Sequence, residues 1–312
     1  MRGRDLALLF ALAAMWGAVY TFTKAALAEV SPAFVTAARI SFAAVVLLAA
    51  SPLLGRASGE VAAFGWRNAA KLWRPFLALG ILNAVVPYTA IAWGTQYMPS
   101  GVAAILNSTQ PIFTAVLCAA LPSFAEERLR ASGALGLGFG LVGVTVLVGG
   151  GVAGESDAAS LLPGVAAVLL GASSFALAGL YARRSMRGVP VPITAVGQSV
   201  AAFPFALPLA LLGPPEEPLS NRTLLSLVLL GAVGTGLALL LFFRLIKTVG
   251  ATRTSTVAYL VPVAALLYGV VLLGEPLTAR ALLGLALILA GVAGVSGAFR
   301  PANRPRKAPP EL

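Results

Sequence analysis

One arginine interrupts an otherwise uncharged apolar stretch near the N-terminus. Arg39 lies about two helical turns into a run from Ala33 to Leu54 and has only small or aliphatic neighbours. A guanidinium in that position could bind the carboxylate of a substrate through two parallel hydrogen bonds. It could also extend toward the lipid headgroups or bind carbonyls at a helix end. Arg39 is therefore a candidate binding residue with a structural alternative.

Two aromatic residues and a threonine share one helical face in the first apolar stretch. Trp16, Tyr20 and Thr23 follow the spacing i, i+4, i+7. Rings that face a cavity would stack on an apolar or aromatic solute, or attract an ammonium group by cation–π interaction. Packing between helices would use the same pattern.

Other polar groups occupy mid-stretch positions, where a polar group in lipid is costly and is a functional candidate by default. Asn107 and Gln110 lie on one helical face, so the two amides could bond each other, a neighbouring helix or a substrate. The remaining candidates for lining a cavity are Asn83, Tyr88, Phe175, Gln198 and Tyr259. Pro111 and Pro262 are candidate hinges, because proline removes a backbone donor and bends a helix, although static curvature is the alternative.

Several kinds of catalytic chemistry are excluded by missing residue types. Histidine is absent and Cys118 is the only cysteine, so an intramolecular disulfide, Ser-His-Asp hydrolysis and histidine-based zinc or haem sites are ruled out. The sequence also lacks a Walker-type phosphate loop. We expect no enzyme activity, no cofactor and no metal.

The composition indicates that lipid surrounds most of the chain. Of the 312 residues, 59% are hydrophobic and 11% are charged, and the mean hydropathy is +0.91. A water-soluble fold could not cover that much apolar surface with so few charges. The net charge of +11 would suit nucleic acid in a soluble protein, but in a membrane protein it marks the cytoplasmic loops. We therefore expect the bilayer, and no nucleic acid, as a partner.

Charge-free stretches predict ten membrane-spanning helices, since one span needs about 20 apolar residues. The stretch from Pro75 to Ala125 has 51 residues, more than one span can hold, so it must fold back near Tyr97–Gly101. The other predicted spans are Leu6–Thr23, Ala33–Leu54, Ala131–Gly149, Leu161–Ala182, Pro192–Leu212, Thr223–Ile246, Thr254–Leu273 and Ala281–Phe299.

The connecting segments carry a strongly uneven charge. One alternate set contains 18 of the Lys and Arg residues, and the other set contains three. The positive-inside rule then places both termini in the cytoplasm. The N-terminus could also be a signal peptide cleaved near Ala26–Ala28, but its apolar run is longer than such a segment needs, so we expect a retained helix.

The two halves of the chain resemble each other. Gly80–Thr114 aligns with Gly231–Ala265 without a gap, Trp16 aligns with Phe175, and Arg39 aligns with Gln198. Each half holds five predicted spans, and an odd number makes the second half enter the membrane from the opposite side. We therefore predict an all-α integral membrane protein of ten helices, arranged as two inverted five-helix repeats around a central cavity. The expected boundaries are 1–150 for the first repeat, 151–160 for a linker, 161–299 for the second repeat and 300–312 for a basic cytoplasmic tail.

These features resemble the EamA family of the drug/metabolite transporter superfamily. The resemblance covers about residues 6–299 and rests on Met15-Trp16-Gly17, the Ser31-Pro32…Arg39 pattern, the two proline helices, and the Gly-Glu-Pro-Leu-Thr run at 274–278 with Gly284 and Gly291. It implies a ten-helix bundle in the bacterial inner membrane that moves small organic solutes. Helices 1–4 and 6–9 would surround the cavity, and helices 5 and 10 would lie outside it.

The resemblance is greatest to amino-acid exporters of the YddG type. It implies a secondary transporter that exports amino acids, including aromatic and neutral ones, by alternating access, and we expect a monomer. Drugs, nucleosides and sugar derivatives are alternative solutes, and a channel is an alternative mechanism. No acid lies at mid-span, and Glu29, Glu127 and Glu275 fall near helix ends. We therefore expect a uniporter, with proton coupling through an edge carboxylate as the alternative.

Overall fold

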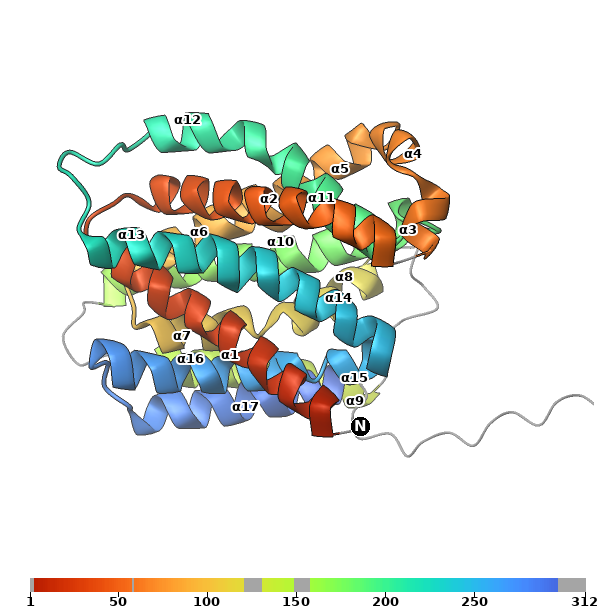
Figure 1. The fold of residues 1–312 in the computed structure, drawn as a ribbon. Helices are drawn as coiled ribbons and strands as arrows, with labels where there is room; N and C mark the ends of the chain where they lie inside the picture. The colour runs from red at the N-terminus through yellow and green to blue at the C-terminus, as the bar shows by residue number, and fades with distance from the viewer. Residues whose placement is uncertain (1–2, 58, 121–130, 149–157, 297–312) are drawn as a thin grey trace, which may run out of the picture.

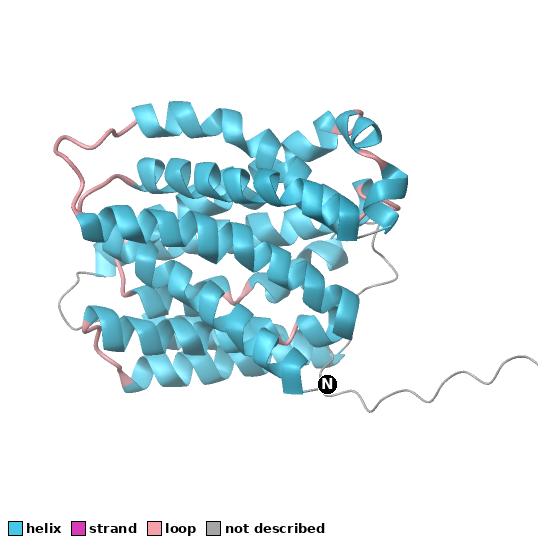
Figure 2. Cartoon of the chain, in the orientation of Figure 1, coloured by secondary structure: helices cyan, strands magenta, loops and turns pink. Residues whose placement is uncertain are grey.

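The computed structural model is helical throughout the residues that it describes, which are 3–57, 59–120, 131–148 and 158–296. In that part of the chain the helices are joined by short loops, and no strand occurs (Figure 2). Helices suit this composition, because in lipid each backbone N–H and C=O group must find its partner within the protein. The expectation of an all-α fold is confirmed.

The first half contains several helices that are interrupted rather than straight. Its elements are α1 (Gly3–Ala26), α2 (Pro32–Ala57), α3 (Gly59–Phe64), α4 (Trp66–Ala70), α5 (Trp73–Gly80), the π-helical η1 (Ile81–Val85), α6 (Val86–Thr95), α7 (Ser100–Asn107), α8 (Gln110–Ala120) and α9 (Ala131–Val148). The α5, η1 and α6 segments follow one another without a gap, and the chain turns back between Thr95 and Ser100, where the sequence predicts a turn.

The second half has the same kind of interruptions. Its elements are α10 (Ala158–Ser185), α11 (Val191–Ala202), the 3-10 turn η3 (Phe203–Phe205), α12 (Ala206–Leu211), α13 (Asn221–Val228), the π-helical η4 (Leu229–Leu237), α14 (Ala238–Val249), α15 (Ala251–Thr254), α16 (Val257–Leu273) and α17 (Ala279–Ser296). The α13, η4 and α14 segments likewise follow one another without a gap.

Much of the outer surface is suited to lipid. Among the residues that the structure describes, seven helical stretches are long and apolar enough to cross a membrane, and three shorter apolar helices cover Leu135–Val148, Val257–Leu273 and Ala279–Gly294. Leu135, Leu212 and Val271 are between 69% and 77% exposed. A soluble protein rarely exposes so many large apolar side chains, so this surface is the expected contact with acyl chains.

The helices lie side by side, and successive long helices run in opposite directions (Figure 1). As a result, α1 begins and α17 ends at the same end of the bundle (Figure 1). Small residues allow the closest approaches. A Cβ added to Gly17 of α1 would lie 2.6 Å from the Cβ of Ala264 in α16. One added to Gly291 of α17 would lie 2.6 Å from the carbonyl oxygen of Gly136 in α9.

The two π-helical segments occupy matching places in the sequence. The offset that lays Gly80 on Gly231 places η1 within the range of η4. The glycine before η1 packs against the backbone of α11, where an added Cβ would lie 3.0 Å from the carbonyl oxygen of Gln198. A Cβ on Gly231 would lie 2.9 Å from the carbonyl oxygen of Arg39 in α2. Two matched glycines thus contact two matched residues of the other half.

Candidate functional site

The candidate site begins with Arg39, which α2 places against η4 and α6. Its Nε donates a hydrogen bond to Thr235 Oγ1 at 2.9 Å, and the Thr235 hydroxyl donates to the carbonyl of Leu230 at 3.0 Å. The Arg39 Cζ lies 3.7 Å from the centre of the Tyr88 ring. These partners come from helix interiors, so in this conformation Arg39 neither reaches toward headgroups nor binds the carbonyls of a helix end.

The positive charge of Arg39 has no counter-ion within the described residues. No carboxylate in that part of the chain contacts its guanidinium, and its described partners are a hydroxyl group and an aromatic ring. Arg39 is half-buried, and a charge within an apolar span is costly without a partner. A carboxylate with two oxygens matches the planar fork of arginine. The arrangement is chemically suited to binding an anionic group.

A second polar pair, Tyr20 and Asn107, joins α1 to α7. The Nδ2 of Asn107 donates to the hydroxyl oxygen of Tyr20 at 2.8 Å. The Oδ1 of Asn107 is buried and has no hydrogen-bond partner among the described residues. Tyr20 lies within electrostatic range of Arg39, so the two polar groups belong to one neighbourhood. A buried acceptor without a donor costs about 1–3 kcal/mol, and a donor on a ligand would remove that cost.

The helix that carries Asn107 is broken next to it. Helix α7 ends at Asn107, α8 begins at Gln110, and the hydroxyls of Ser108 and Thr109 donate to the carbonyls of Ile105 and Leu106. Side-chain hydroxyls therefore replace helical hydrogen bonds at the break. Helices broken at membrane depth commonly form the substrate sites of transporters. The sequence predicts one span here, and Ser100–Ala120 is long and apolar enough to be one, with a local interruption of the helix at these two residues.

The two aligned prolines occupy different local structures. Pro111 is the second residue of α8, where proline fits a helix start without the loss of a helical hydrogen bond. Pro262 lies inside α16, whereas the interruption before that helix falls at Ser255 and Thr256. The hinge role predicted for both residues stays a prediction.

Gln198, which aligns with Arg39, has a partner of its own. The Nδ2 of Asn83 in η1 donates to the Oε1 of Gln198 in α11 at 3.1 Å. The hydroxyl of Ser174 in α10 donates to the carbonyl of Leu82, also in η1, at 2.7 Å. Each π-helical segment thus contacts a polar side chain of the opposite half. The partner of η1 is the neutral Gln198, and the partner of η4 is the cationic Arg39.

The aromatic candidates fall into two contacts. Tyr88 packs edge-on against Phe175 with ring centres 6.2 Å apart, which connects Phe175 to the Arg39 neighbourhood. Trp16 packs against Phe242 of α14 at 5.3 Å and belongs to a different apolar cluster from Tyr20. Tyr259 packs against the apolar cluster that contains Tyr20, and Gln110 is half-buried at the start of α8.

The structure therefore unites some candidates and separates others. We define the central cluster as Tyr20, Arg39, Tyr88, Asn107 and Thr235. Sequence reasoning missed Thr235, which lies in the glycine-rich run Gly231–Gly236. A hydroxyl residue among glycines inside an apolar stretch was the available signal, but hydropathy alone does not reveal that it faces Arg39.

Comparison with known proteins agrees with this architecture. The sequence pattern of the EamA-like transporter family matches residues 5–149 and 162–297. The chain belongs to this family. A protein of known crystal structure shares the fold, with a TM-score of 0.63 and 24% identity, over 96% of this chain and 98% of the other.

Three relatives carry informative names. A probable amino-acid metabolite efflux pump of Salmonella typhimurium is 30% identical over 66% of this chain and 69% of its own length. A probable terminal-alkyne amino-acid exporter of Streptantibioticus cattleyicolor is 27% identical over 89% and 88%. The uncharacterized inner membrane transporter YedA of Escherichia coli is 27% identical over 91% and 88%. The protein is thus a multi-pass membrane transporter of this family, and the composition predicts the membrane location.

Proposed function

We propose that this EamA-family transporter exports amino acids by alternating access, and that it does so as a uniporter. The proposal includes ten spans in two inverted repeats, with boundaries at residues 150 and 161 and with both termini in the cytoplasm. Support for the repeat comes from the two matched family segments and from the matched π-helical segments η1 and η4. The exporter names of two relatives support the solute class.

One observation carries the solute assignment. Arg39 has no carboxylate partner in the described chain, and the neighbouring Asn107 has an unpaired, buried Oδ1. A zwitterionic amino acid carries the two groups that these side chains need. Its carboxylate would bind the guanidinium of Arg39, and its ammonium would donate to Asn107 Oδ1 and face the rings of Tyr20 and Tyr88. A drug cation would lack the first interaction and a sugar would lack both.

The candidate residues outside the central cluster would line the solute path or join the helices around it. Phe175 would line the site through its contact with Tyr88, and Trp16, Gln110 and Tyr259 would border the path. The hydrogen bond between Asn83 and Gln198 would join η1 to α11 at the position that matches the Arg39 contact. Because no acid lies at mid-span, net flux would follow the solute gradient, without a proton relay through the site.

Uptake of labelled amino acids into liposomes that contain the purified protein tests the proposal. Wild-type protein is expected to show faster uptake when unlabelled amino acid is present on the opposite side, because a carrier exchanges solutes. Arg39→Gln should lower this uptake at least about tenfold, since a hydrogen bond to a charged group is worth 1.5–3 kcal/mol. Arg39→Lys should recover part of it, because lysine keeps the charge but loses the planar fork.

Arg187→Gln is the matched control, because Arg187 is exposed in the loop after α10. Undiminished uptake by Arg39→Gln would show that Arg39 does not bind the solute. Uptake without acceleration by the opposite pool would favour a channel. Selective uptake of nucleosides or sugars in place of amino acids would overturn the solute class. An imposed pH gradient that drives accumulation would overturn the uniport mechanism.

A further inference from the structure

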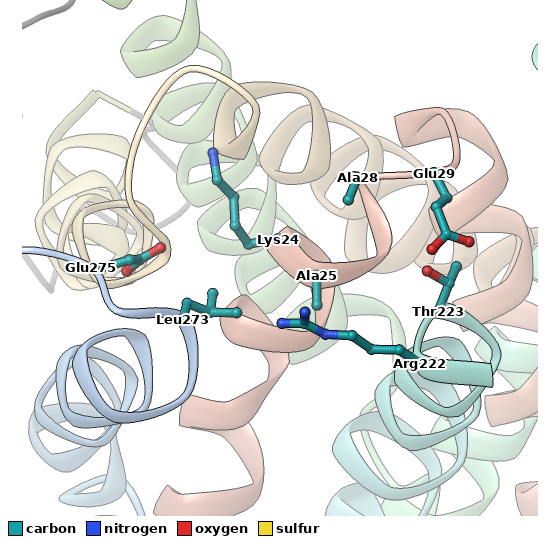
Figure 3. Close-up of a pocket in the computed structure, with 8 residues that line it drawn as sticks. All are labelled: Lys24, Ala25, Ala28, Glu29, Arg222, Thr223, Leu273 and Glu275. Atoms are coloured by element: carbon teal, nitrogen blue, oxygen red, sulfur yellow. The ribbon is translucent and has the colours of Figure 1, made fainter. Parts of the chain in front are cut away.

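A cavity of about 300 Å³ lies at the end of the bundle opposite to the first residues of α1. Its charged lining residues are Lys24, Glu29, Arg222 and Glu275, and Ala25, Ala28, Thr223 and Leu273 complete it (Figure 3). The four charged groups come from both halves of the chain. In Figure 3, Lys24 and Glu275 point toward the turn between α6 and α7 and lie on its two sides.

Lys24 holds the incoming side of that turn. Its Nζ donates to the carbonyl oxygens of Thr95, Gln96 and Met98 at 2.8, 3.1 and 3.0 Å. The last carbonyls of a helix lack helical partners and carry partial negative charge, so an ammonium group is well matched to the end of α6. All three donors of the ammonium group are used.

Glu275 holds the outgoing side of the same turn. Its Oε1 accepts from the backbone N–H of Ser100 at 2.6 Å, and its Oε2 accepts from the Ser100 hydroxyl at 2.8 Å and from the N–H of Gly101 at 3.3 Å. These N–H groups begin α7, where a carboxylate is favoured. Gly269 leaves room for the carboxylate, because a side-chain carbon there would occupy the position of Glu275 Oε2.

The Glu275 contacts join the two halves near the central cluster, whereas Lys24 joins α1 to the turn within the first half. Glu275 belongs to the α16–α17 loop, and it binds the first turn of α7. Lys24 follows Tyr20 by four residues on α1, or about 6 Å, and Ser100 precedes Asn107 by seven residues on α7, or about 10 Å. A solute that leaves the central cluster toward this end meets the turn within about 10 Å.

The neighbouring loops are joined in a similar way, by hydrogen bonds whose partners lie outside the turn. Glu29 accepts from the backbone N–H and the hydroxyl of Ser220 at the start of α13, and the hydrogen bonds from Ser220 hold the pKa of Glu29 below its ordinary value. The hydroxyl of Ser31 donates to the carbonyl of Gly213 at 2.9 Å. These contacts tie the α1–α2 loop to the α12–α13 loop, whereas Lys24 and Glu275 fix α6 and α7.

We propose that Lys24 and Glu275 are gating residues of the transport cycle, and that their contacts with residues 95–101, here called the turn clamp, close the solute path at this end. The proposal rests on the proposed alternating-access function. The cavity above the clamp is the vestibule into which the path opens. Opening requires α1 and the α16–α17 loop to part from the turn, which breaks charge-assisted hydrogen bonds. The release of Glu275 from α7 separates the two halves at this end, and the release of Lys24 frees the turn from α1.

Distances between spin labels test the gate without a solute. Labels on Ala28→Cys and Leu277→Cys, in a Cys118→Ser background, report the separation of two exposed loops at this end. Lys24→Gln and Glu275→Gln are each expected to move the population toward a longer distance, with at least about a tenfold change in the closed-to-open ratio. Gly269→Ala should do the same without a change of charge, because it displaces the carboxylate.

Two controls separate the clamp from general effects. Glu217→Gln removes an exposed acid in the α12–α13 loop, and Arg222→Gln removes a cation from the same cavity but no hydrogen bond of the clamp. Both should keep the wild-type distances. If the clamp variants fold, melt at lower temperature and still keep those distances, the contacts are structural and the gate proposal is wrong. A Glu275→Gln protein that does not fold leaves the question to Lys24→Gln and Gly269→Ala, which must then show the longer distance.

The result is independent of the solute assignment. If no amino acid is taken up by wild-type liposomes while the clamp variants still show the longer distance, the solute class fails and the gate stands. If uptake is normal and also unchanged in Lys24→Gln and Glu275→Gln, the clamp does not control the path. Uptake lowered at least about fivefold in both variants, with normal uptake by Glu217→Gln, is the expected outcome.

Discussion

At the scale of single residues, the described part of the chain combines a half-buried cation that has no carboxylate partner with buried polar atoms that accept no hydrogen bond. Arg39 contacts a hydroxyl and a ring, and Asn107 Oδ1 accepts no hydrogen bond from the described residues. Such groups lower stability unless a ligand completes them, so they are expected where function opposes stability. The sequence identified Arg39, Tyr20, Tyr88 and Asn107 because polar groups in apolar runs are visible in it. It did not reveal which of them meet, since that depends on helix rotation and neighbours.

Two threonine-to-valine substitutions compare a functional hydroxyl with one that has no partner. Thr235→Val removes the acceptor that orients Arg39, so the KM for solute should rise about threefold to tenfold, with a loss of stability of about 1 kcal/mol. Thr21→Val removes a buried hydroxyl oxygen without a hydrogen-bond partner in the described chain, so stability should stay level or increase. Initial uptake rates and melting temperatures of both purified variants check this. An equal KM in both variants would mean that Thr235 does not position Arg39.

At the scale of helices, hydropathy predicted where spans lie but not where they break. The predicted ends agree with α1 and α10 to within a few residues, and so does the predicted start of the last span with α17, because burial in lipid and the need for internal hydrogen bonds fix long apolar helices. The predicted end of that span at Phe299 lies outside the described residues. The π-helical segments η1 and η4 and the gap at 108–109 were not predicted. They depend on contacts between distant segments, such as Arg39 with Thr235, and on side-chain hydroxyls that compete with the backbone.

Glycine substitutions test the close packing of α9 against α17. Gly291→Leu should lower the melting temperature by several degrees, because a Cβ there would lie 2.6 Å from the carbonyl oxygen of Gly136 and 2.7 Å from the nitrogen of Gly140. Gly138→Ala is the matched control, since an added Cβ has no atom within 4 Å and alanine favours a helix by about 0.5–1 kcal/mol. Thermal unfolding in detergent gives both values. A Gly291→Leu protein as stable as wild type would show that the two helices do not pack this closely.

At the scale of the whole molecule, similarity between the halves is the feature that sequence and structure share. Gly80 and Gly231 pack against the backbones of Gln198 and Arg39, which the alignment also pairs. The side chains at those matched positions differ, so one side of the bundle carries a cation and the other an amide pair. A repeated scaffold with unlike polar groups suits a path in which one half binds the solute and the matched half moves around it. The alignment of the two halves predicts the repeated arrangement of helices. It does not predict the turn clamp, because the conformation of the α16–α17 loop cannot be read from hydrophobic periodicity.

Chemical labelling of single cysteines tests the orientation of the whole bundle. In a Cys118→Ser background, Arg187→Cys lies in the loop after α10 and Leu277→Cys lies in the loop after α16, at opposite ends of the molecule (Figure 1). Basic residues accumulate in the alternate segments that include Arg187, so an impermeant thiol reagent should reach that position only from the cytoplasm. It should reach position 277 only from the opposite side, and Arg304→Cys in the C-terminal tail should behave like position 187. Reversed labelling of all three positions would show that the protein has the opposite orientation in the membrane, with the vestibule facing the cytoplasm. Labelling of 187 and 277 from the same side would contradict the alternation of the helices, and with it the two inverted repeats on which the alternating-access proposal depends.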